Sequence, residues 1–497
     1  MRLSELAAEL APELTVRHRG ADVLVAGVRR DSRRIAPGEL FVAIPGARVD
    51  GASFAEAALA QGAAALLVER ELSLPVPQLI VSDARRALAL AAHAVYGRPT
   101  EALEVVGITG TNGKTTTAWL VDAMLSGLGA RSALLGTVAR RADSSAAPAA
   151  FTTPEADDLV RFARSAVDGG ATHLVMEVSS HGLVLERVRG VRFRVAVFTN
   201  LSQDHLDFHG DMGAYGEAKA RLFFEHRPAA AVIHVDDPFG AELAPRLGPS
   251  TVRVSLRDPS ADVWLGAARS DREGVSARAR VGGQEVELRS PLVGRHNLEN
   301  LAVALGVAKA LDLDVGEAAS ALAEAPGAPG RLERVPDPRG VAVLVDYAHT
   351  PDALANALGA LRPLTPGRLV VVFGCGGDRD RDKRPKMGRV AAEGADVVVV
   401  TSDNPRTESP HAIVEGIVAG VEAAGMRRAR ELAEGGFVVE LDRREAIEKA
   451  VRAARAGDTV LIAGKGHEDY QIVGTERRAF DDRRVAAEVI AALGEEG

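Results

Sequence analysis

The sequence predicts an α/β protein with three domains, and two observations support this fold class. Along most of the 497 residues, short apolar runs alternate with segments of helical periodicity, a pattern typical of mainly parallel sheets covered by helices. Clusters rich in glycine and proline interrupt the alternation at residues 97–100 and 325–330. They divide the chain into segments 1–98, 99–330 and 331–497, and a chain of this length suits about three domains.

The first segment is expected to form a small α/β domain, because helical patterns separate its apolar runs at 40–44, 63–68 and 78–81. The second segment is expected to hold the central, mainly parallel sheet. Its candidate strands are 103–109, 132–135, 173–178, 195–199 and 230–234, and its candidate helices lie near 114–128, 155–168 and 213–225. Residues 251–292 are more β-like, and we expect them to form an appended antiparallel sheet before a helix at 298–312.

The third segment begins a new α/β alternation. Its candidate strands are 341–345, 369–373, 397–401 and 459–462, with helices between them. This order predicts a second α/β sheet, separate from the central one.

Composition narrows the functional class. A net charge of −8 and a pI near 5.9 argue against sequence-independent nucleic-acid binding, which needs a basic surface. A single cysteine, Cys375, excludes an intramolecular disulfide and suits a reducing compartment. The N-terminal residues lack the apolar core of a signal peptide, and no apolar run has the length of a membrane span. We therefore expect a cytoplasmic protein without a membrane span.

The most informative motif follows the apolar run 103–109. It reads Gly110-Thr111-Asn112-Gly113-Lys114-Thr115 and leads into a predicted helix. Such a loop can surround phosphate with backbone N–H groups, while its lysine reaches the terminal phosphates and its threonine hydroxyl ligates Mg²⁺. The usual spacing G-x-x-x-x-G-K-[ST] would place glycine at Ile108, so this is a variant loop. A plain strand–helix turn is the alternative, but the flanking strand and helix favour nucleotide binding.

Polar residues follow the next two candidate strands, at the sheet edge where open α/β sheets bind ligands. Glu177 comes after the strand residues 173–176, and His205 lies in the polar run after 195–198. Mg²⁺ prefers oxygen ligands and shares them with phosphates, so Glu177 is a candidate metal ligand. His205 is either a less usual ligand or a residue that orients a neighbour.

Four polar clusters follow the strands of the third segment. They are 346–349, 374–379, Asp403-Asn404-Pro405-Arg406 and Gly464-Lys465-Gly466-His467-Glu468. Any one of them could be a tight loop, because Asn-Pro and glycine pairs form turns. Together they place the cations Arg379 and Arg406 and the anion Glu468 at one sheet edge. This mixture suits a zwitterionic ligand that carries carboxylates and amines.

Taken together, these motifs resemble the Mur ligase family of peptidoglycan synthesis over essentially the whole chain. The loop 110–116, Asn297 in the run 294–300, Arg331, and the element 346–349 each resemble a family signature. The resemblance implies a three-domain Mur ligase architecture. Its N-terminal domain would bind a UDP-sugar, its central P-loop domain ATP, and its C-terminal Rossmann-like domain an amino acid.

The resemblance also implies roles for individual residues near the nucleotide. ATP would contact Gly110, Thr111, Asn112, Gly113, Lys114, Thr115, Thr116, Asn297, Arg331 and His349. Two Mg²⁺ ions would be held by Thr115, Glu177, His205 and Lys219. By its spacing alone Lys219 would be an ordinary surface lysine, but it falls on the family's carbamylated lysine, whose carbamate derives from CO₂. Lys114, His205 and Lys219 would therefore be catalytic.

Two further sets of residues match the family's substrate contacts. The UDP-sugar peptide would contact Arg30, Ser32, Ala47, Arg48, Val49, Thr152, Thr153, Ser179 and Arg187. The amino acid would contact Arg379, Asp403, Asn404, Pro405, Arg406, Gly464 and Glu468. Some members carry a glutamine where this chain has Leu185.

The resemblance is strongest to members that add meso-diaminopimelate to UDP-N-acetylmuramoyl-L-alanyl-D-glutamate. In the family the tetrapeptide 403–406 marks this group, and Arg406 would pair with the carboxylate that lysine lacks. ATP would convert the D-glutamyl carboxylate into an acyl phosphate, which the amine then attacks. We expect a monomer. The alternatives are a ligase that adds L-lysine, a folylpolyglutamate-synthase-like enzyme, and a P-loop NTPase or binding protein without ligase chemistry.

Overall fold

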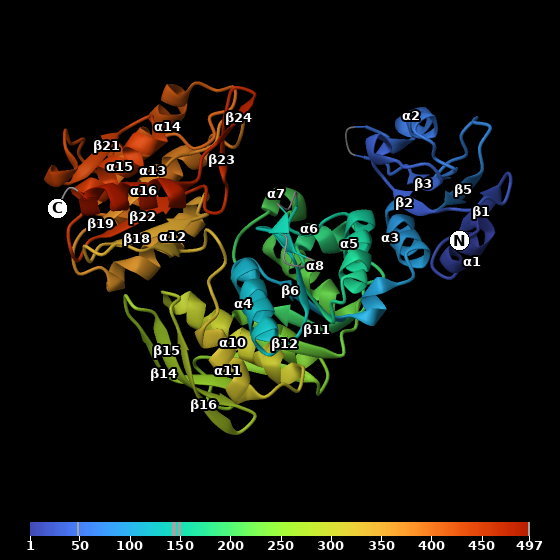
Figure 1. Ribbon diagram of the computed structural model, residues 1–497, viewed down its shortest axis with the longest axis horizontal. Coiled ribbons are helices and arrows are strands. Elements are labelled where there is room, and N and C mark those ends of the chain that lie inside the picture. The colour runs from blue at the N-terminus through green and yellow to red at the C-terminus, as the bar shows by residue number, and fades with distance from the viewer. Residues whose placement is uncertain (47–48, 142–145, 148–150, 496–497) are drawn as a thin grey trace. The chain divides into compact units, whose positions relative to one another are not determined.

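The computed structural model describes residues 1–46, 49–141, 146–147 and 151–495. The chain divides into two compact units (Figure 1). One contains Met1–Gly266, Ala279–Val286 and Glu299–Leu322, and the other contains Ala267–Arg278, Glu287–Leu298 and Ala323–Gly497. Both units consist of sheets and packed helices, so the predicted α/β class is confirmed.

The N-terminal part of the first unit contains a five-stranded sheet in the order β1-β5-β4-β3-β2. Its strands are β1 (Val16–Arg19), β2 (Gly27–Arg29), β3 (Glu39–Val42), β4 (Ala65–Val68) and β5 (Gln78–Val81). All neighbouring pairs are parallel except β1 with β5. The three predicted strands of this segment correspond to β3, β4 and β5, whereas the edge strands β1 and β2 were not predicted. The helices here are α1 (Leu3–Leu10), α2 (Ala55–Ala60) and α3 (Ala84–Val95), with 3₁₀ turns at Ser32–Arg34, Gly51–Phe54 and Pro99–Ala102.

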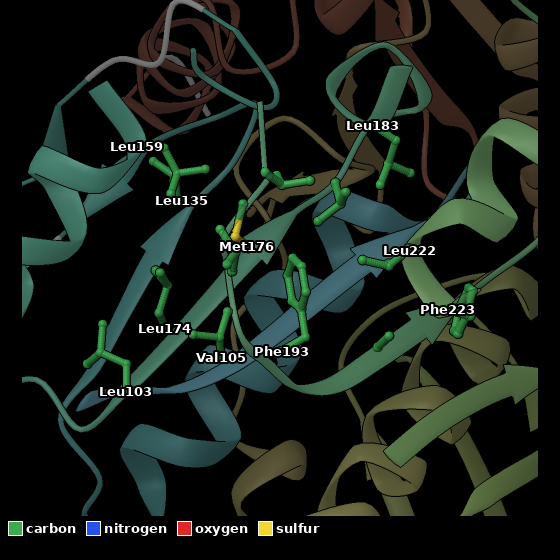
Figure 2. Close-up of a cluster of buried hydrophobic side chains, with 14 of the residues drawn as sticks. Leu103, Val105, Leu135, Leu159, Leu174, Met176, Leu183, Phe193, Leu222 and Phe223 are labelled. Atoms are coloured by element: carbon green, nitrogen blue, oxygen red, sulfur yellow. The ribbon is translucent and has the colours of Figure 1, made fainter. Parts of the chain in front are cut away.

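Six neighbouring strands at the centre of an 11-stranded sheet are parallel and have the order β13-β12-β11-β6-β10-β7. They are β6 (Glu104–Thr109), β7 (Ser132–Leu135), β10 (His173–Glu177), β11 (Phe193–Phe198), β12 (Ala230–His234) and β13 (Thr251–Ser255). Most residues of these strands are apolar and buried, as expected for a parallel sheet that helices cover. Figure 2 shows part of this core, where Val105, Leu174, Met176 and Phe193 lie between strands and helices.

The region 251–292 corrects one expectation. Strand β13 pairs in parallel with β12, and β14 (Val263–Ser270) pairs in parallel with β13, so both extend the central sheet. Strands β15 (Val275–Val281) and β16 (Gln284–Ser290) follow them in the strand order, joined by Gly282 and Gly283. Residues 271–274 join β14 to β15 in the same way. Links this short require antiparallel neighbours, so the expected antiparallel arrangement holds for β14, β15 and β16. At the opposite edge are the short antiparallel strands β8 (Arg140–Arg141) and β9 (Ala146–Ala147).

Helices near the central sheet agree with the predicted positions. The predicted ones are α4 (Lys114–Gly127), α5 (Ala156–Asp168), α8 (Met212–Phe224) and α10 (Arg295–Ala310), whereas α11 (Val315–Ala323) was not predicted. Short helices are α6 (Ser180–Val184), α7 (Leu206–His209), α9 (Pro238–Leu243) and the 3₁₀ turn Ala244–Arg246. Within the part of the chain that the structure describes, no helix combines the length and apolar character needed to span a membrane.

The second unit contains a six-stranded sheet in the order β17-β18-β22-β19-β20-β21. Its strands are β17 (Glu333–Val335), β18 (Ala342–Asp346), β19 (Leu369–Phe373), β20 (Val397–Val400), β21 (Gly436–Val439) and β22 (Thr459–Ala463). The pairs are parallel except β17 with β18. All four predicted strands are therefore confirmed, as β18, β19, β20 and β22.

Helices pack on both faces of this sheet. One core contains side chains of α12 (Pro351–Leu361), α13 (Lys383–Gly394) and α14 (Pro410–Ala423), and the other those of α15 (Arg443–Ala453) and α16 (Asp482–Glu495). 3₁₀ turns lie at Arg362–Leu364 and Leu432–Glu434. A separate hairpin is formed by β23 (Tyr470–Val473) and β24 (Glu476–Ala479). The carboxyl ends of β18, β19, β20 and β22 carry the four predicted polar clusters.

Candidate active site

The glycine-bearing loop joins the carboxyl end of β6 to the first turn of α4. Gly110 has φ +151° and Gly113 has φ +83°, a region that side-chain-bearing residues rarely adopt. A Cβ on Gly110 would also lie 1.9 Å from Thr199 Oγ1. Both observations explain why glycine occupies position 110. The loop therefore leads into the N-terminus of a 14-residue helix, the arrangement that favours an anion.

Residues after β11 hold the loop in this shape. Asn112 N donates to Asn200 Oδ1 over 2.9 Å, and Thr111 N donates to Asn200 O over 2.8 Å. Thr199 Oγ1 donates to Asn112 O over 2.6 Å. These contacts fix the backbone on which any phosphate contact depends. The sequence indicated a polar run here, but it did not single out Asn200.

Two lysines approach the same backbone carbonyl. Lys114 Nζ donates to Gly110 O over 2.8 Å and to Thr111 O over 2.9 Å, and Lys219 Nζ donates to Gly110 O over 2.9 Å. Lys219 is 1% exposed, so the interpretation of a surface lysine from spacing alone was wrong. Burial, and secondarily the charge of Lys114, lowers the pKa of Lys219 well below its usual value. The Lys219 amine is therefore biased toward its neutral, nucleophilic form.

Glu177 lies at the carboxyl end of β10 and is 1% exposed. Its Oε2 accepts from Thr115 Oγ1 over 2.9 Å and from Thr137 Oγ1 over 3.1 Å, and its Oε1 accepts from Thr137 N over 2.6 Å. Carboxylate and hydroxyl oxygens are the ligand types that Mg²⁺ prefers. Thr115 and Glu177 were both candidate metal ligands, and the structure brings them into direct contact.

His205 occupies a different setting from Glu177. It precedes α7 with φ +52°, and its side chain is 46% exposed, with Nε2 3.4 Å from Asp204 Oδ2. Its ring lies 4.8 Å from that of His181, whose pKa burial lowers to about 4. Among the described residues, no three His, Cys, Asp or Glu side chains gather closely enough to hold a metal. Any ion here would need hydroxyl or phosphate oxygens as well.

Four of the candidate UDP-sugar-peptide residues lie around Glu177. Thr153 Oγ1 donates to Glu177 O over 2.9 Å and lies 3.1 Å from Ser179 Oγ. Arg187 Nη1 donates to Thr153 O over 3.0 Å, and Thr137 Oγ1 lies 3.0 Å from Thr152 Oγ1. The structure therefore brings the candidate substrate residues Thr152, Thr153, Ser179 and Arg187 next to the candidate metal ligand.

The remaining candidates of this set belong to the N-terminal part of the unit. Arg30 N donates to Asp157 Oδ2 over 3.3 Å, and Arg30 Nε lies 3.3 Å from Asp157 Oδ1. Ser32 is 8% exposed in the adjacent 3₁₀ turn, whereas Val49 is 54% exposed. Ala47 and Arg48 lie outside the described residues.

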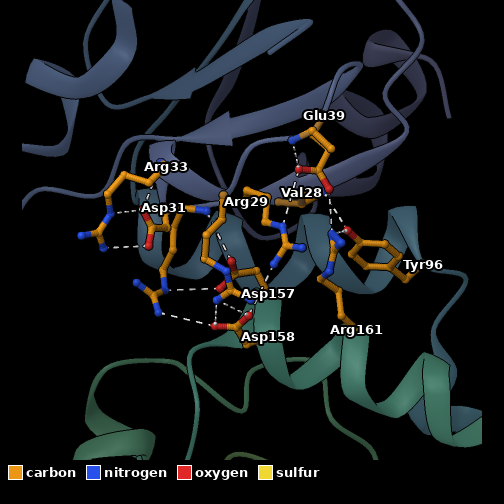
Figure 3. Close-up of polar contacts among 12 residues, drawn as sticks. Val28, Arg29, Asp31, Arg33, Glu39, Tyr96, Asp157, Asp158 and Arg161 are labelled. Carbon is orange, nitrogen blue, oxygen red and sulfur yellow. Dashed lines mark hydrogen bonds and ion pairs between the residues drawn. The ribbon is translucent and has the colours of Figure 1, made fainter. Parts of the chain in front are cut away.

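Figure 3 shows the polar network that joins the N-terminal part of the first unit to α5. Arg161 Nη1 donates to Glu39 Oε1 over 2.7 Å, and Arg29 Nη1 lies 3.5 Å from Asp158 Oδ1. Burial and the neighbouring Asp158 raise the pKa of Asp157. The segment that carries Arg30 and Ser32 is thus fixed to the helix that begins shortly after Thr152 and Thr153.

In the second unit, an arginine and two aromatic rings gather around the buried Asp346. Asp346 Oδ2 accepts from Leu332 N over 2.7 Å, and burial raises the pKa of its carboxyl group. The Arg331 guanidinium lies 5.0 Å from the Tyr347 ring centroid, and the His349 ring lies 4.5 Å from that of Tyr347. The candidate nucleotide residues Arg331 and His349 therefore share one cluster.

Asn297 is the other candidate nucleotide residue of the second unit. It is 3% exposed, and its Nδ2 donates to Val293 O over 2.8 Å. This contact lies within the second unit, because Val293 and Asn297 both belong to it.

The candidate amino-acid residues meet at the ends of β19, β20 and β22. Asn404 Nδ2 donates to Glu468 Oε2 over 2.9 Å. A Cβ on Gly464 would lie 3.6 Å from Asp403 Oδ2, and one on Gly376 would lie 2.9 Å from Arg406 Nη1 and 3.7 Å from Arg379 Cγ. All the candidates of this set thus occupy one cluster, which combines two arginines with two carboxylates.

The hairpin β23–β24 determines the backbone of the tetrapeptide 403–406. Arg406 N donates to Ile472 O over 3.1 Å, and Gly474 N donates to Arg406 O over 2.8 Å. Arg406 adopts φ +52°, and its Nη1 donates to Gly377 O over 2.9 Å and Asn404 O over 3.4 Å. Among the described residues Arg406 forms no ion pair with a carboxylate. Its charge is therefore held by neutral carbonyls.

Comparison with known proteins places this site in a family. Family models described as "Mur ligase family, catalytic domain", "Mur ligase middle domain" and "Mur ligase, glutamate ligase domain" match residues 24–108, 108–308 and 330–466. A Geobacter metallireducens protein named UDP-N-acetylmuramoyl-L-alanyl-D-glutamate–2,6-diaminopimelate ligase is 45% identical over 514 residues, which cover 100% of both chains. The chain belongs to the Mur ligase family.

Further relatives and solved structures support this family assignment. A Gloeobacter violaceus protein of the same name is 46% identical over 99% of this chain and 98% of its own. A solved structure of a UDP-N-acetylmuramoyl-L-alanyl-D-glutamate–2,6-diaminopimelate ligase superposes with a TM-score of 0.68 at 35% identity, over 95% of each chain. The folylpolyglutamate synthase of Mycobacterium tuberculosis shares the fold with a TM-score of 0.59 at 22% identity, over 82% of this chain and 94% of that one.

The structure of this Mur ligase also adds side chains that the sequence analysis did not single out. Thr137 binds Glu177, Asn200 binds the loop 110–115, and Lys465 and Gln471 bind the tetrapeptide 403–406. Lys465 lies inside a motif that the sequence had indicated. Thr137 and Gln471 carry no signal in the sequence, because only the fold brings them to these partners.

Proposed function

We propose that this Mur ligase joins meso-diaminopimelate to the D-glutamate of UDP-N-acetylmuramoyl-L-alanyl-D-glutamate and converts ATP to ADP and phosphate. Relatives that carry this activity in their names are 45–46% identical over nearly the full chain. The observation that carries the proposal is the arrangement of Arg406. Its guanidinium lies in the amino-acid cluster beside Arg379 and is held by backbone carbonyls.

In this arrangement, some N–H donors of Arg406 remain for a ligand carboxylate. A guanidinium has five N–H groups, and the observed contacts use those of Nη1. Nε and Nη2 can then form a bidentate pair with the second carboxylate of diaminopimelate, which lysine lacks. A site built to bind such a group rejects an analogue without it, because its buried polar atoms would remain unpaired. This supports diaminopimelate over L-lysine as the substrate.

The first chemical step is assigned to the first unit. The D-glutamyl carboxylate attacks the γ-phosphorus of ATP, which forms an acyl phosphate and releases ADP. Both reactants are anionic, so Lys114 and the loop N–H groups would offset their repulsion. The diaminopimelate amine then attacks the acyl carbon, an amide forms, and phosphate leaves. Positioning and electrostatics account for this chemistry without a covalent enzyme nucleophile.

Mg²⁺ is proposed as the metal, and the residues present suit it. Thr115 and Glu177 supply a hydroxyl and a carboxylate in contact over 2.9 Å, and His205 and Lys219 would complete the two ion sites. When bound, Mg²⁺ neutralises phosphate charge. The low pKa of Lys219 favours the neutral amine that adds to CO₂, which supports the proposed carbamate. A labelled-bicarbonate NMR signal that is lost in Lys219→Met would test that modification directly.

We also propose that segments 1–98, 99–330 and 331–497 bind the UDP-sugar, ATP and the amino acid, in a cytoplasmic monomer. Most candidate residues follow this division. The exceptions are the UDP-sugar-peptide residues near Glu177, which lie in segment 99–330, and the candidate ATP residues Arg331 and His349, which lie in segment 331–497.

A coupled ADP assay with an amino-acid panel tests the proposal. Purified protein, ATP, Mg²⁺ and UDP-N-acetylmuramoyl-L-alanyl-D-glutamate are supplied with meso-diaminopimelate, L-lysine, D-glutamate or no amino acid. ADP release that requires both the UDP-dipeptide and meso-diaminopimelate, with a tripeptide product in the mass spectrum, is the expected result. Release with lysine instead would support the lysine ligase, and release from ATP alone would support an NTPase.

A further inference from the structure

Lys465 is a completely buried cation in the middle of the amino-acid cluster. It follows β22, and its side chain is 0% exposed. Its Nζ donates to Asn404 Oδ1 and to Glu468 Oε2, each over 3.2 Å, and lies 3.6 Å from Asp403 Oδ1. A buried ammonium is costly unless it is paired and hydrogen-bonded. Here every one of these partners belongs to the proposed diaminopimelate site.

The contacts form a closed ring of hydrogen bonds. Lys465 donates to Asn404 and to Glu468, and Asn404 Nδ2 donates to the same Glu468 oxygen over 2.9 Å. Ile472 N also donates to Asn404 Oδ1 over 2.9 Å. Two donors therefore meet at the amide oxygen, which fixes the orientation of the Asn404 amide group.

This ring determines what the cluster presents to a ligand. Glu468 Oε2 is occupied twice, so Glu468 Oε1, which accepts no hydrogen bond from the described residues, remains for an ammonium group. Asn404 keeps one N–H donor for a carboxylate. Without Lys465, the carboxylates of Asp403 and Glu468 would repel each other, and the Asn404 amide could rotate.

We propose that Lys465 is a positioning residue that sets the affinity and selectivity for the amino-acid substrate by orienting Glu468 and Asn404. The inference rests on the proposed function and deepens it. The ligand class is an amino acid whose ammonium and carboxylate are read by the two oriented side chains. Lys465 itself need not touch the substrate.

Lys465→Met tests the proposal in the assay with meso-diaminopimelate. A charged hydrogen-bond partner is lost, so KM for meso-diaminopimelate should rise about ten- to a hundredfold. KM for ATP and for the UDP-dipeptide should stay within about twofold. Lys449→Met is the matched control, because Lys449 pairs with Glu440 on the surface of the same unit and is 52% exposed. It should behave as the wild type.

A double-mutant cycle with Glu468→Gln distinguishes positioning from a general structural role. If Lys465 acts through Glu468, Lys465→Met should raise KM at least about fivefold less in the Glu468→Gln background than in the wild type. The double variant also lacks the Glu468 carboxylate, so Asp403 and Glu468 no longer repel each other when the lysine is absent. Should Lys465→Met alone fail to fold, a KM of the double variant within about threefold of Glu468→Gln is then the supporting result.

Equal effects of Lys465→Met in the two backgrounds would overturn the inference. If the single variant does not fold, a KM of the double variant more than about threefold above that of Glu468→Gln would overturn it. An unchanged KM in folded Lys465→Met would refute it while leaving the proposed function intact. A wild type that does not join meso-diaminopimelate would refute the proposed function, and the inference with it.

Discussion

Replacing Arg406 is expected to remove most of the preference for meso-diaminopimelate over L-lysine. The structure lets the size of the effect be worked out. Nη1 is used by Gly377 O and Asn404 O, so three N–H groups remain, enough for one bidentate carboxylate pair. A hydrogen bond to a charged group contributes about 1.5–3 kcal/mol. Arg406→Ala should therefore lower kcat/KM for meso-diaminopimelate by roughly 10- to 150-fold and change that for lysine little.

The assay is the coupled measurement of ADP release, with both amino acids compared in each variant. Arg406→Lys retains the charge but not the planar fork, so its selectivity should fall between wild type and Arg406→Ala. Arg444→Ala is the control, because Arg444 pairs with Glu488 on the surface of the same unit and is 53% exposed. A selectivity ratio in folded Arg406→Ala within about threefold of the wild type would refute the assigned pairing.

Three further predictions concern the first unit. Lys114→Met should lower kcat for ADP release about 10²- to 10³-fold with unchanged circular dichroism, and a loss below tenfold would contradict its role. Gly110→Ala should lower the unfolding free energy by about 2–4 kcal/mol in urea, because its φ is +151° and its Cβ would meet Thr199, whereas Gly248→Ala meets no atom within 4 Å and should be neutral. Burial lowers the pKa of His93 to about 4, so stability present above pH ~6.5 is lost as the pH falls toward 4. The unfolding free energies of His93→Leu and wild type are compared at pH ~6.5 and at pH ~4. The decrease between these pH values should be up to about 3 kcal/mol smaller in His93→Leu, and an equal decrease in both proteins would refute the role of His93.

The strands that were predicted correctly have one property in common. Strands such as β19 and β20 are buried on both faces, so they appear in the sequence as unbroken apolar runs. Edge strands lack this signal: β1 alternates intermediate and exposed residues, and β2 has only three residues. The direction of β13 could not be read at all, because parallel or antiparallel pairing depends on the path of the chain between strands.

The candidate site divides in a similar way. The loop 110–115 could be singled out from the sequence, because its glycines and Gly113-Lys114-Thr115 are neighbours in the chain, although its phosphate binding stays a prediction. Lys219 could not be identified by spacing, since its burial depends on Gly110 and Tyr215, which the fold brings to it. The roles of Thr137 and Lys465 likewise depend on partners distant in the sequence or on burial. Family resemblance located Lys219, whereas geometry supplied the reason for its low pKa.

Backbone conformation offers a further sign of where the chain is under functional constraint. His205 and Arg406 both have φ +52°, and Leu332, which follows Arg331, has φ +45°. Such conformations cost about 1–3 kcal/mol in residues other than glycine and persist only where surrounding contacts enforce them. At Arg406 those contacts are the two backbone hydrogen bonds to the hairpin β23–β24. The hairpin therefore holds Arg406 in a conformation it would not adopt alone, and this directs its guanidinium toward Gly377 and Arg379. A shortened hairpin should consequently lose selectivity for diaminopimelate even with Arg406 retained, and undiminished selectivity would show that the side chain alone suffices.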